Sequence, residues 1–218
     1  MKKIVLSLTL IFSVILGFGQ QKMMPVKLDS LVTISFPAGY QTKDTAGQHI
    51  ISMNGEFGYM IAISAANEKN NAPLKKEKDL NNVLKDYTQK IQAQEPGSSP
   101  IHARDTTVGT LKARVFTLKS DDGEGNVQFV NFTLLYTQDA TYTFEYVYPG
   151  NRSELVANEY KTFISSIRLS PELQRNDQYL SNATGMSSIN KIAILGGIGL
   201  AAIVVWIIVT SMRRLRTS

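Results

Sequence analysis

The sequence lacks cysteine altogether, and it contains only two histidines and one tryptophan in 218 residues. The absence of cysteine excludes disulfide bonds, a lipid anchor on a cysteine, and the thiolate ligands of most structural zinc sites. His49 and His102 lie far apart in the sequence, and neither has a second histidine at i+4. We therefore expect no metal on the histidines, no cofactor, and a domain held together by its apolar core.

Sequence motifs of common catalytic sites are also missing. The chain has no G-x-S-x-G, no G-x-x-x-x-G-K-[ST] and no G-x-G-x-x-G. One acidic cluster, Asp121, Asp122 and Glu124, could offer oxygen ligands to a hard cation such as Ca²⁺. Its spacing is not that of an EF-hand, and a polar hairpin turn explains the same residues. The sequence predicts a protein that is not an enzyme, with these three acids as alternative metal ligands.

Charged residues are absent from a long run near the C-terminus, from Ile192 to Thr210. A helix of this length spans about 28 Å, close to the hydrocarbon thickness of a bilayer. Trp206 lies one turn from its distal end, and Arg213, Arg214 and Arg216 follow it. Because cationic flanks stay on the cytoplasmic side, we expect a transmembrane helix over 192–210 and a cytoplasmic tail over 211–218.

Small residues recur on one face of this apolar run, at Ala193, Gly197 and Ala201. Their spacing of four residues allows a second membrane helix to approach closely. The helix could therefore self-associate or pair with another membrane protein. The alternative is that glycine and alanine are simply common in membrane helices.

The N-terminus has the pattern of a secretory signal. Lys2 and Lys3 precede an apolar stretch, and Gly17 and Gly19 flank Phe18 as a small-x-small cleavage site. We expect residues 1–19 to be a signal peptide, with an uncleaved signal anchor as the alternative. Either reading places the middle of the chain outside the cytoplasmic (inner) membrane of a bacterium, in the periplasm, with a single-pass anchor in the lipid bilayer.

The net charge of +5 comes from the two ends of the chain. Of the 23 Lys and Arg, two lie in the leader and four flank the apolar run, which leaves 17 against 18 Asp and Glu. Nucleic-acid binding needs a concentrated basic face. A middle region of charge −1 argues against it.

Hydrophobic periodicity predicts one α+β domain over 28–170. Alternation and turn residues predict strands at 32–36, 49–53, 59–65, 111–118, 127–136 and 141–148. Amphipathic helices are expected at 75–94 and 152–167. The fold class is thus an antiparallel sheet of about six strands flanked by two helices. Residues 20–27 would be an N-terminal lead, and the polar residues 171–191 a tether to the membrane helix.

One predicted strand carries aromatic residues at every second position: Tyr142, Phe144, Tyr146 and Tyr148. Such a stripe covers a helix or a second sheet more often than it binds a ligand, since an antiparallel sheet normally buries one face. We expect these four rings to belong to the core.

The layout resembles the PsbP-like α/β/α sandwich, which is also found in DcrB-type bacterial envelope proteins. The likeness rests on Val32-x-Ile34-x-Phe36-Pro37-x-Gly39-Tyr40, the strand–hairpin–helix order, the three-strand meander and the closing helix at 163–167. Tyr40 stands where the family often has tryptophan. The resemblance implies an accessory role at a membrane assembly, and it transfers no functional residue to this chain.

Three functional hypotheses follow. The first is a non-enzymatic accessory domain that binds another envelope or membrane protein. The second is a ligand- or ion-sensing domain that signals through a membrane partner, because a tail of eight residues is too short to signal itself. The third is an envelope enzyme with an unrecognised site, since function depends on a site and not on a fold.

Overall fold

The computed structural model describes residues 22–45, 47–68, 72–95, 98–121 and 126–180. The predicted signal peptide, the membrane helix over 192–210 and the tail arginines at 213, 214 and 216 lie outside these residues. So do the small-residue positions Ala193, Gly197 and Ala201. No helix among the described residues combines the length and apolar character needed to cross a bilayer.

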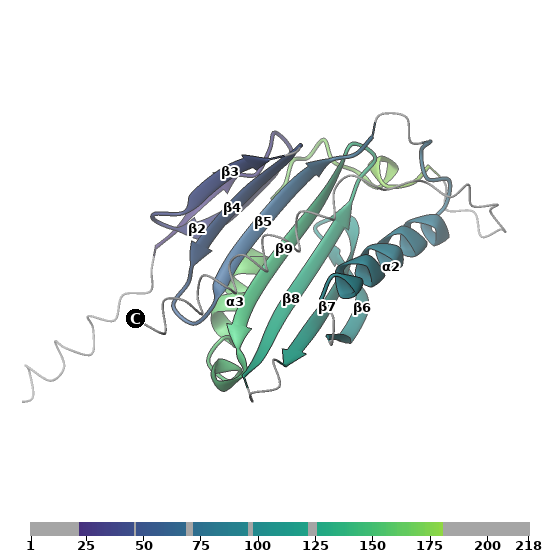
Figure 1. The fold of residues 1–218 in the computed structure, drawn as a ribbon. Helices are drawn as coiled ribbons and strands as arrows, with labels where there is room; N and C mark the ends of the chain where they lie inside the picture. The colour runs from purple at the N-terminus through teal and green to yellow at the C-terminus, as the bar shows by residue number, and fades with distance from the viewer. Residues whose placement is uncertain (1–21, 46, 69–71, 96–97, 122–125, 181–218) are drawn as a thin grey trace, which may run out of the picture.

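The centre of the fold is an antiparallel sheet of seven strands in the order β3-β4-β5-β9-β8-β7-β6 (Figure 1). Hairpin connections join the neighbours within β3–β5 and within β6–β9, and β5 pairs with β9 to unite the two groups. The strand bounds are β3 Gln41–Thr45, β4 Gln48–Asn54, β5 Tyr59–Ala66, β6 Ser99–Val108, β7 Leu111–Asp121, β8 Val127–Tyr136 and β9 Ala140–Pro149.

A smaller sheet and two helices complete the sandwich. The small sheet has the order β1-β2-β10, with β1 Met23–Lys27, β2 Val32–Pro37 and β10 Arg168–Leu169. Helix α2, Glu77–Ala93, packs on one face of the large sheet, and α3, Ala157–Ser165, packs on the other (Figure 1). The small sheet lies on the α3 side, since β2 shares its core with α3. Two short 3-10 turns, η1 Gly150–Arg152 and η2 Arg175–Asp177, follow β9 and β10.

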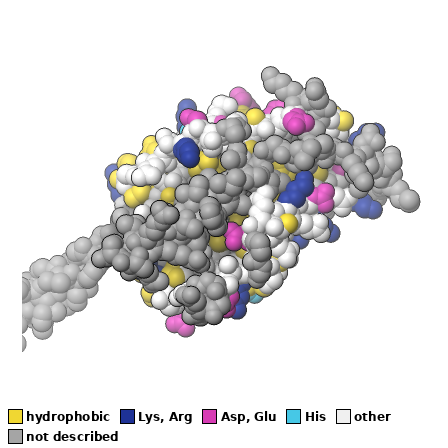
Figure 2. Space-filling model, in the orientation of Figure 1, with side chains coloured by type: hydrophobic (Ala, Val, Ile, Leu, Met, Phe, Trp, Pro, Cys, Tyr) yellow, Lys and Arg dark blue, Asp and Glu magenta, His cyan; other side chains and the backbone are white. Residues whose placement is uncertain are grey.

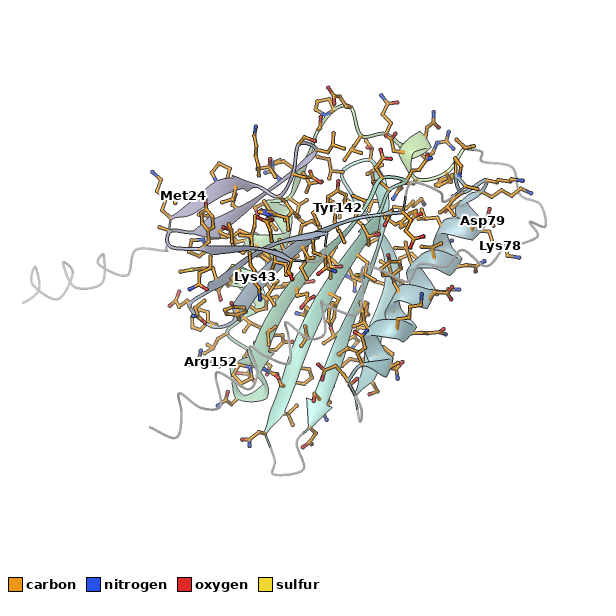
Figure 3. The ribbon with its side chains drawn as sticks, turned by 45° about the horizontal axis from the view of Figure 1, so that its top comes forward. Met24, Lys43, Lys78, Asp79, Tyr142 and Arg152 are labelled. Atoms are coloured by element: carbon orange, nitrogen blue, oxygen red, sulfur yellow. The ribbon has the colours of Figure 1, made fainter. Side chains whose placement is uncertain are left out.

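Helix α2 forms where the sequence predicts it, within a residue or two at each end. Its apolar positions recur at three- and four-residue steps and are buried, namely Leu80, Val83, Leu84, Tyr87 and Ile91. Asp79 lies in the first turn and accepts a hydrogen bond from the Lys76 backbone N–H at 3.1 Å, which satisfies a donor at the helix start. Figure 3 shows Asp79 and its neighbour Lys78 at this end of the helix.

Strand β9 is buried on both faces, which explains its central position. Tyr142, Phe144 and Tyr146 are fully buried against β2 and α3, and Tyr148 packs at the edge of the same cluster. The prediction that this aromatic stripe belongs to the core is confirmed. The alternating sequence pattern predicts that the opposite face of the strand is polar and exposed. In the structure α2 covers this face, and the Tyr87 hydroxyl of α2 lies 3.2 Å from the Thr141 hydroxyl.

The structure contains more strands than the sequence predicts. All six predicted strands are present, but the large sheet has seven, and β1, β2 and β10 form a second sheet. The four missed strands, β1, β3, β6 and β10, lie at sheet edges, and each is mostly exposed or half-buried. An edge strand that buries little apolar surface shows no clear alternation, so periodicity cannot reveal it. The predicted helix at 152–167 is also shorter, because turns replace its first residues.

The first ten residues of the predicted tether are folded onto the domain. Leu173 and Tyr179 are buried, one in each of the two cores. The side chain of Gln178 accepts a hydrogen bond from the Lys112 N–H and donates to the carbonyls of Lys112 and Tyr136, each at 2.8 Å. These contacts extend the domain from residue 170 to residue 180.

One carboxylate links α3 to the β4–β5 hairpin. Glu159 accepts hydrogen bonds from the backbone N–H groups of Glu56 at 2.6 Å and Phe57 at 2.9 Å, and from the Tyr146 hydroxyl. A Cβ at Gly55 would come within 2.3 Å of the Glu159 Oε1 atom, so a side chain at this position would displace the carboxylate from its donors. The hairpin is thus held to the helix by a charged acceptor that serves three donors.

We expect Glu159→Gln to lower the free energy of unfolding by about 2 kcal/mol, because the charge is lost and an NH₂ group must face backbone donors. Urea denaturation followed by circular dichroism would measure the change. Glu154, which is exposed on the preceding turn, offers a matched control. Equal stability of Glu159→Gln and Glu154→Gln would contradict a role for this carboxylate.

Candidate ligand groove

A broad concave surface lies on the α3 side of the sheet. It encloses about 1190 Å³ and is bordered by β6, by α3 and by the segment 168–175. Its floor is formed by β7 and β8, through Val115, Thr117, Asn131 and Thr133. A strand edge thus forms one wall of this groove, and a helix with its following segment forms the other.

A β-bulge in β6 turns Arg104 toward the groove. His102 and Ala103 lie opposite one residue of β7, between the pairs Ile101–Thr117 and Arg104–Val115. Without the extra residue, Arg104 would pair with Arg114 and point to the α2 face, because side chains alternate along a strand. His102 adopts φ of 54°, a left-handed conformation that costs free energy for a residue with a Cβ. The bulge therefore holds a basic side chain at the groove wall at the expense of local strain.

The groove is lined by basic residues without acidic counterparts. Arg104 lies on the β6 wall, and Lys161, Arg168 and Arg175 lie on the opposite wall. None of the described residues that line it is Asp or Glu. By contrast, positive and negative side chains are interspersed over the described surface of the α2 side (Figure 2). A near-neutral domain thus collects four of its cations in one concave surface.

Two of these cations already have partners within the fold. The Arg168 guanidinium donates to the backbone carbonyls of Ser165 and Ile167, at the C-terminal end of α3. Arg175 lies over the Tyr179 ring, 5.2 Å from its centroid. Arg104 and Lys161 form no salt bridge with any described residue, and both are exposed. A ligand in the groove could therefore contact Arg104 on one wall and Lys161 on the other.

The floor of the groove is polar where it meets α3. Thr117 donates a hydrogen bond to the Asn131 side chain at 2.7 Å. The Thr133 hydroxyl is buried and forms no hydrogen bond of normal geometry with the described residues. Burial raises the pKa of the neighbouring Tyr160, an effect that the nearby Thr133 hydroxyl and Arg104 partly oppose. The floor thus presents a hydroxyl group beneath the two basic walls.

No catalytic arrangement is found among the described lining residues. Their only hydroxyl groups belong to serine, threonine and Tyr160, and no carboxylate lies beside them to act as a base. His102 lies on the strained edge strand and forms no hydrogen bond to a nucleophile within the described part of the chain. The described lining of the groove presents hydrogen-bond donors and positive charge.

The residues proposed from the sequence as metal ligands do not gather at this groove. Asp121 ends β7, whereas Asp122 and Glu124 lie outside the described residues. No group of three potential metal-ligating side chains occurs within 22–45, 47–68, 72–95, 98–121 and 126–180. His49 binds Asp44 on the adjacent strand, with 2.6 Å between Nδ1 and Oδ1. Sequence reasoning did not identify Arg104 or Lys161, because their proximity depends on the topology.

A second feature that the sequence did not reveal is a buried carboxyl group on β9. Glu145 lies between Ile61 and Phe132 of the neighbouring strands, and it is fully buried. Neither of its oxygens forms a hydrogen bond with the described residues. Loss of solvation, with a smaller contribution from the negative charge of Glu95, raises the pKa of Glu145 to about 8. The carboxyl group is therefore mostly protonated at neutral pH.

Comparisons with known proteins identify the fold. No protein-family model and no curated protein sequence matches the chain. The solution structure of the cyanobacterial PsbP protein CyanoP from Synechocystis sp. PCC 6803 is similar, with a TM-score of 0.51 and 14% identity. The match covers 71% of this chain and 96% of that one.

Two further structures match at lower TM-scores. A protein from Bacteroides thetaiotaomicron VPI-5482 has 15% identity and a TM-score of 0.40. The match covers 71% of this chain and 50% of that one. Protein PA94 from Pseudomonas aeruginosa has 12% identity and a TM-score of 0.45, over 68% and 98% of the two chains. At 14% identity, the match to CyanoP shows a similar fold and nothing beyond it. The similarity to CyanoP confirms the resemblance found in the sequence, and the described residues form a PsbP-like sandwich.

Proposed function

We propose that this chain is a non-enzymatic accessory domain on the outer side of a bacterial cytoplasmic membrane, where it binds another envelope or membrane protein. The observation that carries the proposal is the basic groove, which has donors on both walls and no base beside a nucleophile. Nucleophilic catalysis needs such a pair within reach of the substrate, and metal-assisted catalysis needs a metal there. A binding domain needs only a concave surface of complementary chemistry.

The membrane part of the proposal is supported by the sequence. The apolar run over 192–210 has the length of a membrane span, and the arginines that follow favour the cytoplasmic side. The N-terminal signal pattern agrees with this orientation. A partner embedded in the same bilayer could also contact the small residues Ala193, Gly197 and Ala201.

The absence of cysteine makes a direct test possible, since every introduced thiol is unique. We would place single cysteines at Thr107 on the groove rim, at Lys85 on the exposed face of α2, and at Thr217 in the tail. Spheroplasts would then be treated with a membrane-impermeant thiol reagent that carries a photo-crosslinker. The labelled chain and its crosslinked products would be identified by mass spectrometry.

We expect the thiols at 107 and 85 to react in sealed spheroplasts and the thiol at 217 to react only after permeabilisation. We expect a discrete crosslinked protein from position 107 and none from position 85. Labelling of position 217 alone would place the domain inside and overturn the topology. Full labelling of position 107 without a crosslinked protein would argue against a protein partner at the groove.

A further inference from the structure

The charge distribution of the groove indicates the chemistry of its ligand. The part of the chain from 21 to 190 has slightly more acids than bases, yet four bases and no acid line this surface. A concave, single-sign surface concentrates the electric field and attracts ligands of the opposite sign. The ligand that complements this groove is therefore negatively charged.

The shape of the groove favours an extended ligand over a small anion. At about 1190 Å³ it exceeds the usual size of a small-molecule site, and a phosphate would fill only a small part of it. Its basic residues come from two opposite walls, with Arg104 on β6 and Lys161 on α3. A ligand that contacts both must cross the floor between the strand and the helix.

Apolar and polar positions are mixed along the groove. The apolar residues Val108, Ile164 and Leu169 share its lining with the threonines of the floor. A peptide that alternates acidic and apolar side chains matches this surface, because carboxylates meet the guanidinium and ammonium groups while aliphatic side chains cover apolar area. Nucleic acid is a poorer match, because it needs a longer basic face and aromatic residues on which bases stack.

The bulge provides a second, independent argument that Arg104 has a role in binding. The backbone keeps His102 in a left-handed conformation, and the consequence is that Arg104 faces the groove and not the α2 side. Strain that persists at one position is typical of functional sites. Arg104 itself is exposed and forms no salt bridge with the described residues, so the fold does not need its charge.

We propose that the groove between β6 and α3 binds an extended acidic peptide segment of the partner protein, with Arg104 and Lys161 as paired charge contacts from its two walls. This proposal rests on the proposed function and specifies the partner's chemistry. Arg168 and Arg175 add positive charge, while their hydrogen bond and ring contacts hold that wall in place.

The test uses the full chain in nanodiscs of neutral lipid and three fluorescent probes. One is a peptide of alternating Glu and Leu, the second replaces every Glu with Gln, and the third is a vesicle of anionic lipid. Binding of the peptides is measured by anisotropy, and binding of the vesicles by co-sedimentation. The variant Arg104→Glu/Lys161→Glu is compared with Lys43→Glu/Lys85→Glu, which changes net charge equally at exposed positions outside the groove.

We expect the acidic peptide to bind about tenfold more tightly than its Gln counterpart, because glutamine offers no negative charge to Arg104 and Lys161. The groove variant should lose about tenfold in affinity and the control variant should lose little, because rim charges outside the site act only at long range. Raising the salt from about 50 to about 300 mM should weaken the wild-type interaction.

Equal affinity for the acidic and Gln peptides would overturn the peptide proposal. Binding of anionic vesicles that depends on Arg104 and Lys161, without peptide binding, would overturn it in favour of a lipid headgroup. Either result can coexist with a crosslinked protein at position 107, so failure here is distinguishable from failure of the proposed function.

Discussion

Replacing Glu145 with leucine is expected to stabilise the fold by about 3 kcal/mol at pH 7, because a fully buried carboxyl group without hydrogen-bond partners is removed. The pKa of Glu145 rises from 4.5 to about 8 on folding. Since the folded-state value is the higher one, folding takes up a proton between these two pH values. The resulting penalty is absent below pH 4.5, grows with pH up to about 8, and is constant above it.

The pH dependence separates ionisation from packing. Between pH 5 and pH 8 the free-energy difference between Glu145→Gln and wild type should grow by about 1.4 kcal/mol per pH unit. Glutamine has nearly the same shape as glutamate but does not titrate, so any packing difference is a constant offset. Urea denaturation at each pH, followed by circular dichroism, measures both chains.

Asp86→Asn is the matched control, because Asp86 lies on the exposed side of α2. This control also removes one carboxyl group, so it measures at each pH how the loss of a surface acid alone changes stability. If the Glu145→Gln and wild-type profiles run parallel, the carboxyl group is ionised in the folded protein. Glu145 would then have access to water or to a cation.

Replacing Gln178 with alanine is expected to lower the free energy of unfolding by about 3 kcal/mol, because three backbone groups lose their partner together. The side chain of Gln178 is the partner of the Lys112 N–H and of the Lys112 and Tyr136 carbonyls. Only 2% of the surface of Gln178 is exposed, so water has little access to the three backbone groups if the side chain is removed. Denaturation of the full chain would report the loss.

Gln89→Ala, at an exposed position of α2, should change stability by less than about 0.5 kcal/mol. A second comparison uses chains that end at Ser170 or at Leu180. The shorter one lacks Leu173, Gln178 and Tyr179, and it should be several kcal/mol less stable, on the order of the burial of two large side chains plus the lost hydrogen bonds. Equal stability of the two would show that residues 171–180 are only a linker.

The central strands were predictable because their pattern repeats along the sequence. The meander β7–β9 has short polar connections and long apolar strands, and α2 has an uninterrupted apolar stripe. These signals are local. The edge strand β6 carries Pro100, His102, Arg104 and Asp105 over ten residues, and nothing in this composition distinguishes it from a loop. Its pairing with β7 is set by hairpin geometry.

The candidate groove was not predictable from the sequence. Arg104 and Lys161 are 57 positions apart in the numbering, and either one would be interpreted as an ordinary surface charge. Their relation depends on a one-residue bulge and on the packing of α3, and neither leaves a sequence pattern. The burial of Glu145 was missed for a related reason. The alternating pattern of β9 places Glu145 on a face that would be exposed to solvent, but α2, which is distant in the sequence, covers that face.

The docking of residues 171–180 shortens the segment between the domain and the proposed membrane anchor. With the proposed anchor starting at Ile192, only 11 residues follow Leu180, and even fully extended they reach about 40 Å. The groove wall at 168–175 directly precedes this exit point. A partner anchored in the same bilayer would present its juxtamembrane segment at a high effective concentration, so a contact that is weak in solution could suffice on the membrane.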